Sequence, residues 1–179
     1  MSLTLVAPPA EEPVTLAELK AHLKLDGNAE DALLAGLGLA ARQAIEARFQ
    51  IAIIAQSWRL ALDGAPPAPV ALPLSPVLSI DAVGVVRGGV TEALPPSAYD
   101  AQAGRVGRVR IKAPASSADA FGGVVIVFTA GWTNAAAAPE ELKLAIKLLA
   151  AHYYENREGE PPAPAGLGAL VAPFRRVRL

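Results

Sequence analysis

Apolar residues recur at helical spacing near the start of the chain. Leu16, Leu19 and Leu23 fall on one face and predict a helix from residue 16 to about residue 25. Thr15 and Glu18 have the spacing of a capping box, in which the hydroxyl and the carboxylate each accept a backbone N–H. The sequence therefore predicts both the start of this helix and its apolar face.

A second, longer helix is expected after Asn28, a residue that caps helices well. Its apolar positions are Leu33, Leu37, Ala41, Ala44, Ile45 and Phe49. Gly36 and Gly38 interrupt this pattern, and each costs roughly 1 kcal/mol relative to alanine in a helix. Either these glycines admit a close neighbouring backbone, or the helix tolerates them.

Alternation with period two replaces the helical period in the middle of the chain. Residues 54–62 alternate in this way, and further strands are expected at 77–86, 90–94, 99–101, 106–112 and 123–130. Gly88 and Gly89 mark a tight turn between two of them. These residues predict a small antiparallel β-module.

Helical spacing returns at Pro139, a favourable first-turn residue. Leu142, Ile146, Leu149 and Tyr153 form the apolar stripe of this third helix, and Gly159 and the prolines after it end it. The expected fold is α+β: a helical scaffold of three main helices, an inserted β-module and an extended C-terminal tail. The predicted division is 1–52 for the N-terminal arm and helices, 53–132 for the β-module, 133–159 for the C-terminal helix, and 160–179 for the tail.

Composition and charge exclude several classes of function. The net charge of −1 produces no global positive field to attract nucleic acid or anionic membrane. The absence of cysteine excludes disulfides, thiolate metal sites and cysteine nucleophiles. No signal peptide or membrane span is expected, because the start has no basic segment and the longest apolar runs are short.

Residues suited to catalysis or metal binding are scarce. The only histidines are His22 and His152, and no metal-ligand or nucleophile motif surrounds them. Two of the three acidic pairs, Glu30/Asp31 and Glu140/Glu141, lie where helices begin, and acids are favoured there. We therefore expect no catalytic residues, no metal and no cofactor.

Two basic clusters could contact a partner. Arg105, Arg108, Arg110 and Lys112 lie on or beside a predicted strand, the last three on one face. They form either a solvated strand face or a contact with an acidic neighbouring subunit or with DNA.

The second cluster lies at the end of the chain, where basic and apolar residues interleave. Its members are Leu170, Val171, Phe174, Arg175, Arg176, Val177, Arg178 and Leu179. A disordered basic tail would be the default interpretation. Since a purely solvating tail would not need the apolar residues, docking into a partner's groove or open strand edge is favoured.

Five ordered blocks of sequence resemble the phage head–tail connector (adaptor) family. The resemblance is to its long form with an inserted β-module, found in prophages and in gene transfer agents. The blocks are PVTLAELKAHLKLD with EDALL, ARQAIEARFQIAIIAQSW, LPLSPVLSIDAV, AGW with PEELKLAIKLLAAHYYENRE, and LVAPFRRVRL. No single block is specific, but their order and spacing cover nearly the whole chain.

The resemblance implies a structural subunit of the virion neck, assembled in the bacterial cytoplasm, with no catalytic residues to carry over. It implies a ring, usually of twelve copies, that binds the portal protein, extends the DNA channel and joins capsid to tail. The next neck or tail protein, the stopper, would bind below. Residues 170–179 would insert into the portal, and DNA would pass through the channel. The near-neutral net charge of the chain in turn predicts a neutral or acidic channel surface without specific DNA binding, because phosphate contacts repeated around a ring would make DNA stick.

Three alternatives remain at this stage. An enzyme on an unfamiliar α+β scaffold would need a deep pocket with convergent polar groups. A DNA-binding regulator would use the first two helices, although the second offers only Arg42 and Arg48. A stopper or tail terminator would share the location but would usually be β-rich throughout.

Overall fold

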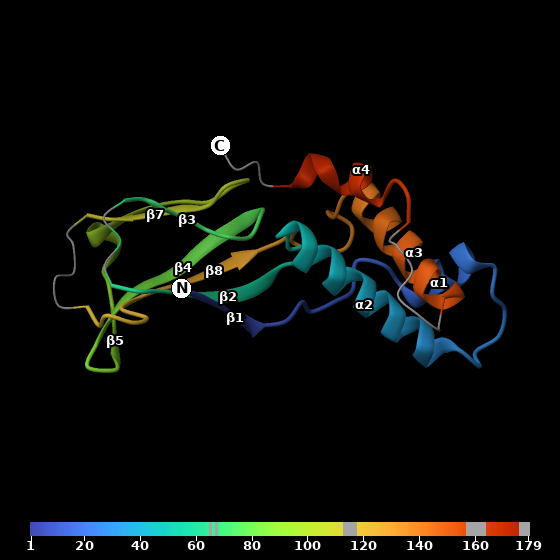
Figure 1. The fold of residues 1–179 in the computed structure, drawn as a ribbon, viewed down its shortest axis with the longest axis horizontal. Helices are drawn as coiled ribbons and strands as arrows, with labels where there is room; N and C mark the ends of the chain where they lie inside the picture. Colours follow the sequence, from blue (N-terminus) through green and yellow to red (C-terminus); the bar gives the residue numbers. More distant parts are fainter. Residues whose placement is uncertain (65, 67, 113–117, 157–163, 176–179) are drawn as a thin grey trace. The chain divides into compact units, whose positions relative to one another are not determined.

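The chain folds into two compact units, and each is described separately (Figure 1). The computed structural model describes residues 1–64, 66, 68–112, 118–156 and 164–175. The β unit comprises Met1–Ala10 and Ala55–Trp132, and the helical unit comprises Glu11–Ile54 and Thr133–Leu179. The fold is mixed α+β, with its described strands in the first unit and its described helices of more than three residues in the second.

The main element of the β unit is a five-stranded antiparallel sheet in the order β1-β2-β8-β4-β5. Its strands are β1 (Ser2–Ala7), β2 (Gln56–Leu62), β4 (Val77–Arg87), β5 (Val90–Ala93) and β8 (Val124–Ala130). Leu60, Ile126 and Val83 are register neighbours across β2, β8 and β4, and all three are buried. The predicted turn at Gly88 and Gly89 joins β4 to β5, where both glycines have positive φ.

A second, three-stranded sheet adjoins β4 in the order β3-β7-β6. It contains β3 (Val70–Ala71), β6 (Tyr99–Gln102), which follows the 3-10 turn η1 (Pro96–Ala98), and β7 (Arg108–Ile111). Val77 and Gly104 exchange two backbone hydrogen bonds of 2.8 Å and so tie the sheets together. Gly107 packs so closely that an added Cβ would lie 2.6 Å from the Val77 side chain.

The first residues form a strand, whereas the sequence predicts only an extended arm. β1 pairs with β2 through Leu3 opposite Leu60 and Leu5 opposite Trp58. The amino group of Met1 also bonds Asp63 at 2.7 Å. These partners lie more than fifty residues away, so local sequence does not reveal the pairing.

The helical unit contains α1 (Leu16–Leu23), α2 (Asp31–Phe49) and α3 (Glu140–Glu155). The predicted capping box is confirmed: the Glu18 N–H donates to the Thr15 hydroxyl at 3.2 Å, and the Thr15 N–H donates to the Glu18 carboxylate at 2.7 Å. The bond from the Thr15 backbone lowers the pKa of Glu18 below its usual value.

The prediction of Asn28 as the cap of the second helix is wrong. Glu30 occupies the cap position and makes no side-chain cap bond. The Asn28 side chain instead accepts a hydrogen bond of 3.0 Å from Lys20, which also pairs with Asp31 at 2.8 Å. Lys20 belongs to α1, so a contact between helices has replaced a local cap.

The two glycines of α2 have different surroundings. A Cβ at Gly38 would lie 2.8 Å from the Leu19 side chain of α1, whereas a Cβ at Gly36 would meet nothing within 4 Å. A close neighbour therefore exists at Gly38, but it is the Leu19 side chain and not the backbone that the sequence suggested. Gly36 is simply tolerated.

The prediction of a wholly extended tail is also wrong for residues 167–174. They form α4 (Leu167–Val171) and the 3-10 turn η2 (Ala172–Phe174). Leu167 and Val171, one helical turn apart, are both buried, and α4 packs against α3 (Figure 1). Burial of these two side chains offsets the cost of ordering a short helix that local sequence does not favour.

Candidate interaction surfaces

The residues predicted to dock into a partner have different environments. Val171 is fully buried inside the helical unit, Leu170 and Phe174 are half-buried, and Arg175 is exposed. Arg176, Val177, Arg178 and Leu179 lie outside the described residues. Within the described part of the segment, Val171 holds α4 in place, while Arg175 is available to a partner.

A groove of about 400 Å³ lies beside Arg175 in the helical unit. The guanidinium groups of Arg48 and Arg175 each approach the ring of Phe49, at 5.8 and 5.7 Å from its centroid. Leu167 and Pro164 add apolar lining. In the described part of the chain neither arginine forms an ion pair, so the groove combines two available cations with an aromatic surface.

Sequence reasoning did not identify this groove. Arg48 and Phe49 end α2, while Arg175 follows η2 more than 120 residues later. Neighbouring Arg and Phe residues at a helix end are too common to signal a site by themselves. Only the packing of α4 brings the second arginine to the ring.

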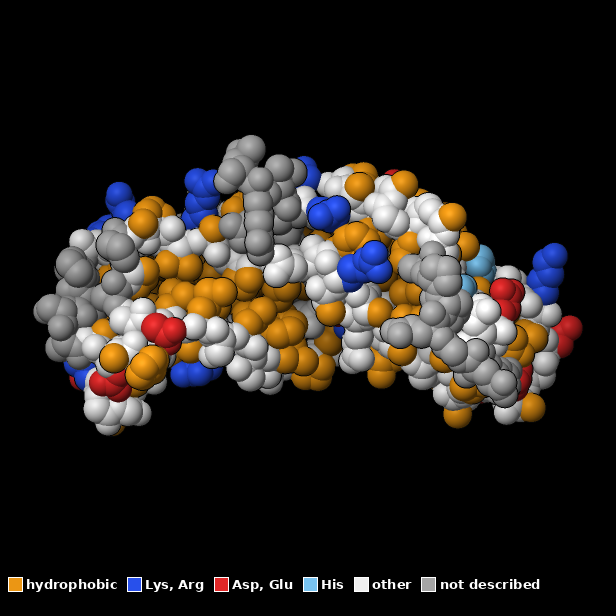
Figure 2. Space-filling model, viewed as in Figure 1, with side chains coloured by type: hydrophobic (Ala, Val, Ile, Leu, Met, Phe, Trp, Pro, Cys, Tyr) orange, Lys and Arg blue, Asp and Glu red, His pale blue; other side chains and the backbone are white. Residues whose placement is uncertain are grey.

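The cations predicted on one strand face are found on β7 and just after it. Arg108, Arg110 and Lys112 are exposed, while Val109 between them is buried. Arg110 and Lys112 share the carboxylate of Asp100 on β6, at 2.5 and 3.1 Å, and lower the pKa of Asp100. Figure 2 shows Lys and Arg side chains projecting near β7.

The same face carries a shallow hollow of about 260 Å³, lined by Arg108, Arg110, Asp100 and Gln102 among others. In the described residues Arg108 has no acidic partner. Arg105 is exposed in the loop that joins β6 to β7 and is not among the residues that line the hollow. Of the four predicted contact residues, three therefore share one surface.

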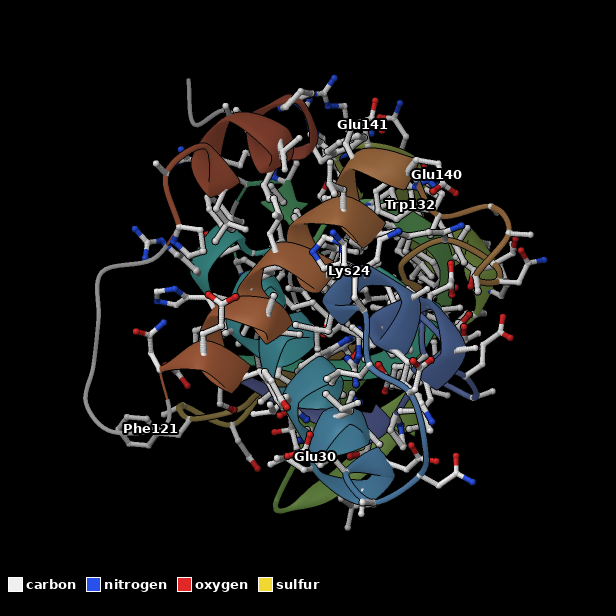
Figure 3. All side chains as sticks on the ribbon, turned by 90° about the vertical axis from the view of Figure 1, so that its right-hand side faces the viewer. Lys24, Glu30, Phe121, Trp132, Glu140 and Glu141 are labelled. Atoms are coloured by element: carbon white, nitrogen blue, oxygen red, sulfur yellow. The ribbon has the colours of Figure 1, made fainter. Side chains whose placement is uncertain are left out.

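The acidic pairs and histidines do not converge on a reactive site. Glu140 pairs with Lys143 at 2.7 Å, and Glu30 accepts a hydrogen bond of 2.5 Å from the Tyr154 hydroxyl. Figure 3 shows Glu140 and Glu141 at the start of α3, where the sequence predicts acids at the positive helix end. Among the described residues no group of three His, Asp or Glu side chains could hold a metal ion.

Arg42, one of the two cations that a DNA-reading second helix would offer, is not available. Its side chain is 5% exposed and bonds Glu12 at 2.7 Å and Glu46 at 2.6 Å. These bonds leave Arg48 as the exposed arginine of α2. The alternative of a DNA-binding regulator therefore loses one of the two cations that its second helix would offer.

The loop before β8 presents an exposed aromatic ring that the sequence did not single out. Phe121 is 87% exposed and projects from the ribbon in Figure 3. Its neighbours are held firmly: Asp119 accepts the N–H groups of Gly88 and Gly89, both at 2.9 Å, and Asp63 accepts that of Gly122 at 3.0 Å. The ring is therefore displayed on an ordered turn.

None of the helices in the described part of the chain combines the length and apolar character of a membrane-spanning segment. No protein-family model and no curated protein sequence gives a significant match to the chain.

Solved structures do resemble the chain over its full length. One comes from the neck of an empty gene transfer agent particle computed with C6 symmetry: it is 32% identical, has a TM-score of 0.82, and the match covers 100% of this chain and 97% of that one. A chain of the virion of a native gene transfer agent particle gives the same identity, TM-score and coverage. A chain from the native neck, computed with C12 symmetry, is 31% identical with a TM-score of 0.80 and the same coverage.

These relatives are chains of virion particles, and their similarity includes both the β unit and the helical unit. The chain belongs to the same family as these neck proteins of gene transfer agent particles.

Proposed function

We propose that the chain is the adaptor of a virion neck, a structural subunit that binds below the portal and connects the capsid to the tail. The single observation that carries the proposal is the match to neck chains over 100% of this sequence and 97% of theirs. A match of this extent includes both units of the chain and not only one of them.

The adaptor acts as a ring of copies, with twelve as the proposed number. Support comes from the similar chains in necks computed with C6 and C12 symmetry. In such a ring each copy contacts its two neighbours through two different surfaces. Few charged residues, 18% of the chain, leave a weakly polar surface that suits such contacts.

The C-terminal segment is the proposed portal-docking element. Leu167 and Val171 hold α4 against α3, so the residues that follow start from an ordered base. Arg175 and the groove at Phe49 provide cations and apolar surface, which suits an acidic and partly apolar segment of the portal. Residues 176–179 add two further arginines to the same end of the chain.

DNA passes through the proposed ring without specific binding. A net charge of −1 per copy supports this proposal, because phosphate contacts repeated around a ring would retard the DNA. We therefore place the cations of β7 away from the channel, against a neighbouring protein.

The test is to mix the purified chain with its cognate portal and image the complex by electron microscopy. The expected result is a ring of this chain directly below the portal. A position further down the neck, separated from the portal by another ring, would reassign the chain as a stopper or tail terminator. A complex in which the chain does not form a ring would reject the proposal.

The docking element is tested separately by deleting residues 175–179. We expect binding to the portal to fall at least tenfold while the fold persists, because the buried residues of α4 all precede the deletion. Arg175→Ala should give part of this loss. Lys24→Ala, which removes an exposed cation from the loop after α1, is the matched control and should bind normally.

A further inference from the structure

The described strands of the β unit leave four sheet edges, which differ in how they are protected from pairing with another chain. Exposed edges present unpaired N–H and C=O groups, and proteins protect them with charges, prolines or very short strands. β3 has two residues and lies between Pro69 and Pro73. β5 has four residues, and its Glu92 pairs with Arg87. β6 has four residues and carries Asp100 with its two cations.

β1 is the least protected of the four edges: the charged Met1 amino group precedes it and Pro8 and Pro9 follow it, but nothing within the strand interrupts the edge. Its six residues, Ser2–Ala7, include no charge and no proline. Leu5 and Val6 are 43% and 57% exposed. A register irregularity at Val6 is confined to the end of the strand, so the regular part from Ser2 to Leu5 is a straight edge of about 13 Å.

The side chains of β1 also indicate what an added strand would contact. Leu3 and Leu5 share a face with Leu60 and Trp58, while Thr4 lies opposite Arg59 on the other face. Figure 2 shows hydrophobic side chains gathered over the visible face of this sheet. A strand added beside β1 would extend the sheet and cover Leu5.

We infer that the outer edge of β1 pairs with an extended segment of a second copy of this chain. The inference rests on the proposed function, because a ring places a second copy beside each subunit, as in the C6 and C12 necks of the relatives. The two contacts of a ring subunit use different surfaces, and among the described strands β1 is the one edge of more than four residues without a charged residue or proline within it. Backbone hydrogen bonds between β1 and the added strand make the contact. Because the edge carries no charged side chain, it favours a partner strand without charged side chains.

A pair of lysine substitutions on opposite edges of the same sheet tests the inference. Thr4 on β1 and Thr91 on β5 are both exposed, so neither substitution buries a charge. We expect Thr4→Lys to lower the fraction of chains in rings at least tenfold, with an unchanged circular dichroism spectrum. Thr91→Lys should assemble like the wild type.

A second variant separates edge pairing from a local effect, because Thr4→Lys also places a cation opposite Arg59. Thr4→Glu attracts Arg59 but still puts a charge on the edge, so it should also prevent ring closure. If Thr4→Glu chains assembled normally, the inference would be overturned.

Cross-linking identifies the occupant, since the chain contains no cysteine and Thr4→Cys gives a single attachment point. A short photo-reactive maleimide at this position, activated in assembled necks, should give a product of twice the chain mass. A product that joins the chain to a different protein would overturn the inference.

The readouts also separate this inference from the proposed function. A Thr4→Lys chain that still binds the portal but does not close into a ring supports both. A wild-type chain that forms rings with dimeric cross-links yet never binds the portal supports the edge pairing and rejects the adaptor function.

Discussion

Arg42 and Glu12 form a two-pronged ion pair that fixes the entry to the helical unit. The Arg42 Nε donates to one Glu12 oxygen at 2.7 Å, and Nη2 donates to the other at 3.1 Å. The second partner, Glu46, accepts from Arg42 at 2.6 Å and from the Ile53 N–H at 2.7 Å. Burial by itself would lower the pKa of Arg42, but the bonds and charges of Glu12 and Glu46 outweigh it and raise that pKa.

Arg42→Ala should therefore destabilise the helical unit by about 3 kcal/mol, because it leaves the mostly buried Glu46 without its cation. Urea unfolding followed by circular dichroism measures this loss. Gln43→Ala, on an exposed face of the same helix, should change stability by less than about 0.5 kcal/mol. Equal effects of the two substitutions would show that the ion pair contributes nothing.

The two glycines of α2 should respond differently to alanine. Gly36→Ala has open space for the methyl group and should raise the free energy of unfolding by about 0.5–1 kcal/mol through helix propensity. Gly38→Ala would push against Leu19, so its propensity gain should be cancelled or reversed. Paired thermal unfolding curves decide this, and equal gains at both positions would contradict the close packing of α1 on α2.

Asp119 should contribute to the acid sensitivity of the β unit. Hydrogen bonds from Gly89 and Gly88 lower the pKa of its carboxylate. A carboxyl group with a lowered folded-state pKa stabilises the fold above its unfolded pKa of about 3.9, and that stability is lost as the pH falls through the lower folded value. Asp119→Asn removes this titrating carboxylate. The free energy of unfolding of the variant should therefore fall less steeply as the pH drops below about 4.

The measurement is urea unfolding of both proteins from neutral pH downwards. Asp63 and Asp100 also have lowered pKa values, from the Met1 amino group and from Arg110 respectively, so the curve should flatten only in part. Parallel curves for the two proteins over the whole range would argue against the contribution of Asp119.

Leu167→Ala should loosen α4 from α3. Removing a buried leucine side chain costs about 2–5 kcal/mol, more than a five-residue helix can lose and stay docked. Hydrogen exchange should become faster at residues 169–171 while the α3 amides stay protected. Leu170→Ala, at a half-buried neighbour, is the matched control and should have a smaller effect.

Local signals in the sequence predicted most elements of the fold correctly. The capping box of Thr15 and Glu18 acts within one helical turn, and the Gly88–Gly89 turn acts between adjacent strands. The alternation of Arg108, Val109 and Arg110 likewise predicts which residues of β7 are buried. Each of these signals involves residues near one another in the chain, so the sequence contains the whole interaction.

The features that the sequence predicted wrongly or missed share a different cause. Asn28, expected as a cap, is bound by Lys20 of another helix, and the first residues pair with a strand more than fifty positions away. The helix at Leu167 exists because α3 buries it, and the groove at Phe49 needs Arg175 from the far end of the sequence. None of these contacts leaves a periodic signal.

The order of residues was thus enough to establish the α+β class, the positions of the main helices and strands, and the resemblance to a neck protein, because periodicity and capping act over a few residues. Three features depended on the folded chain: the exposed edge of β1, the burial of Arg42 and the approach of two arginines to the ring of Phe49. The physical reason is that edges, burial and stacking depend on which distant segments come together, and that is decided by packing of the whole chain.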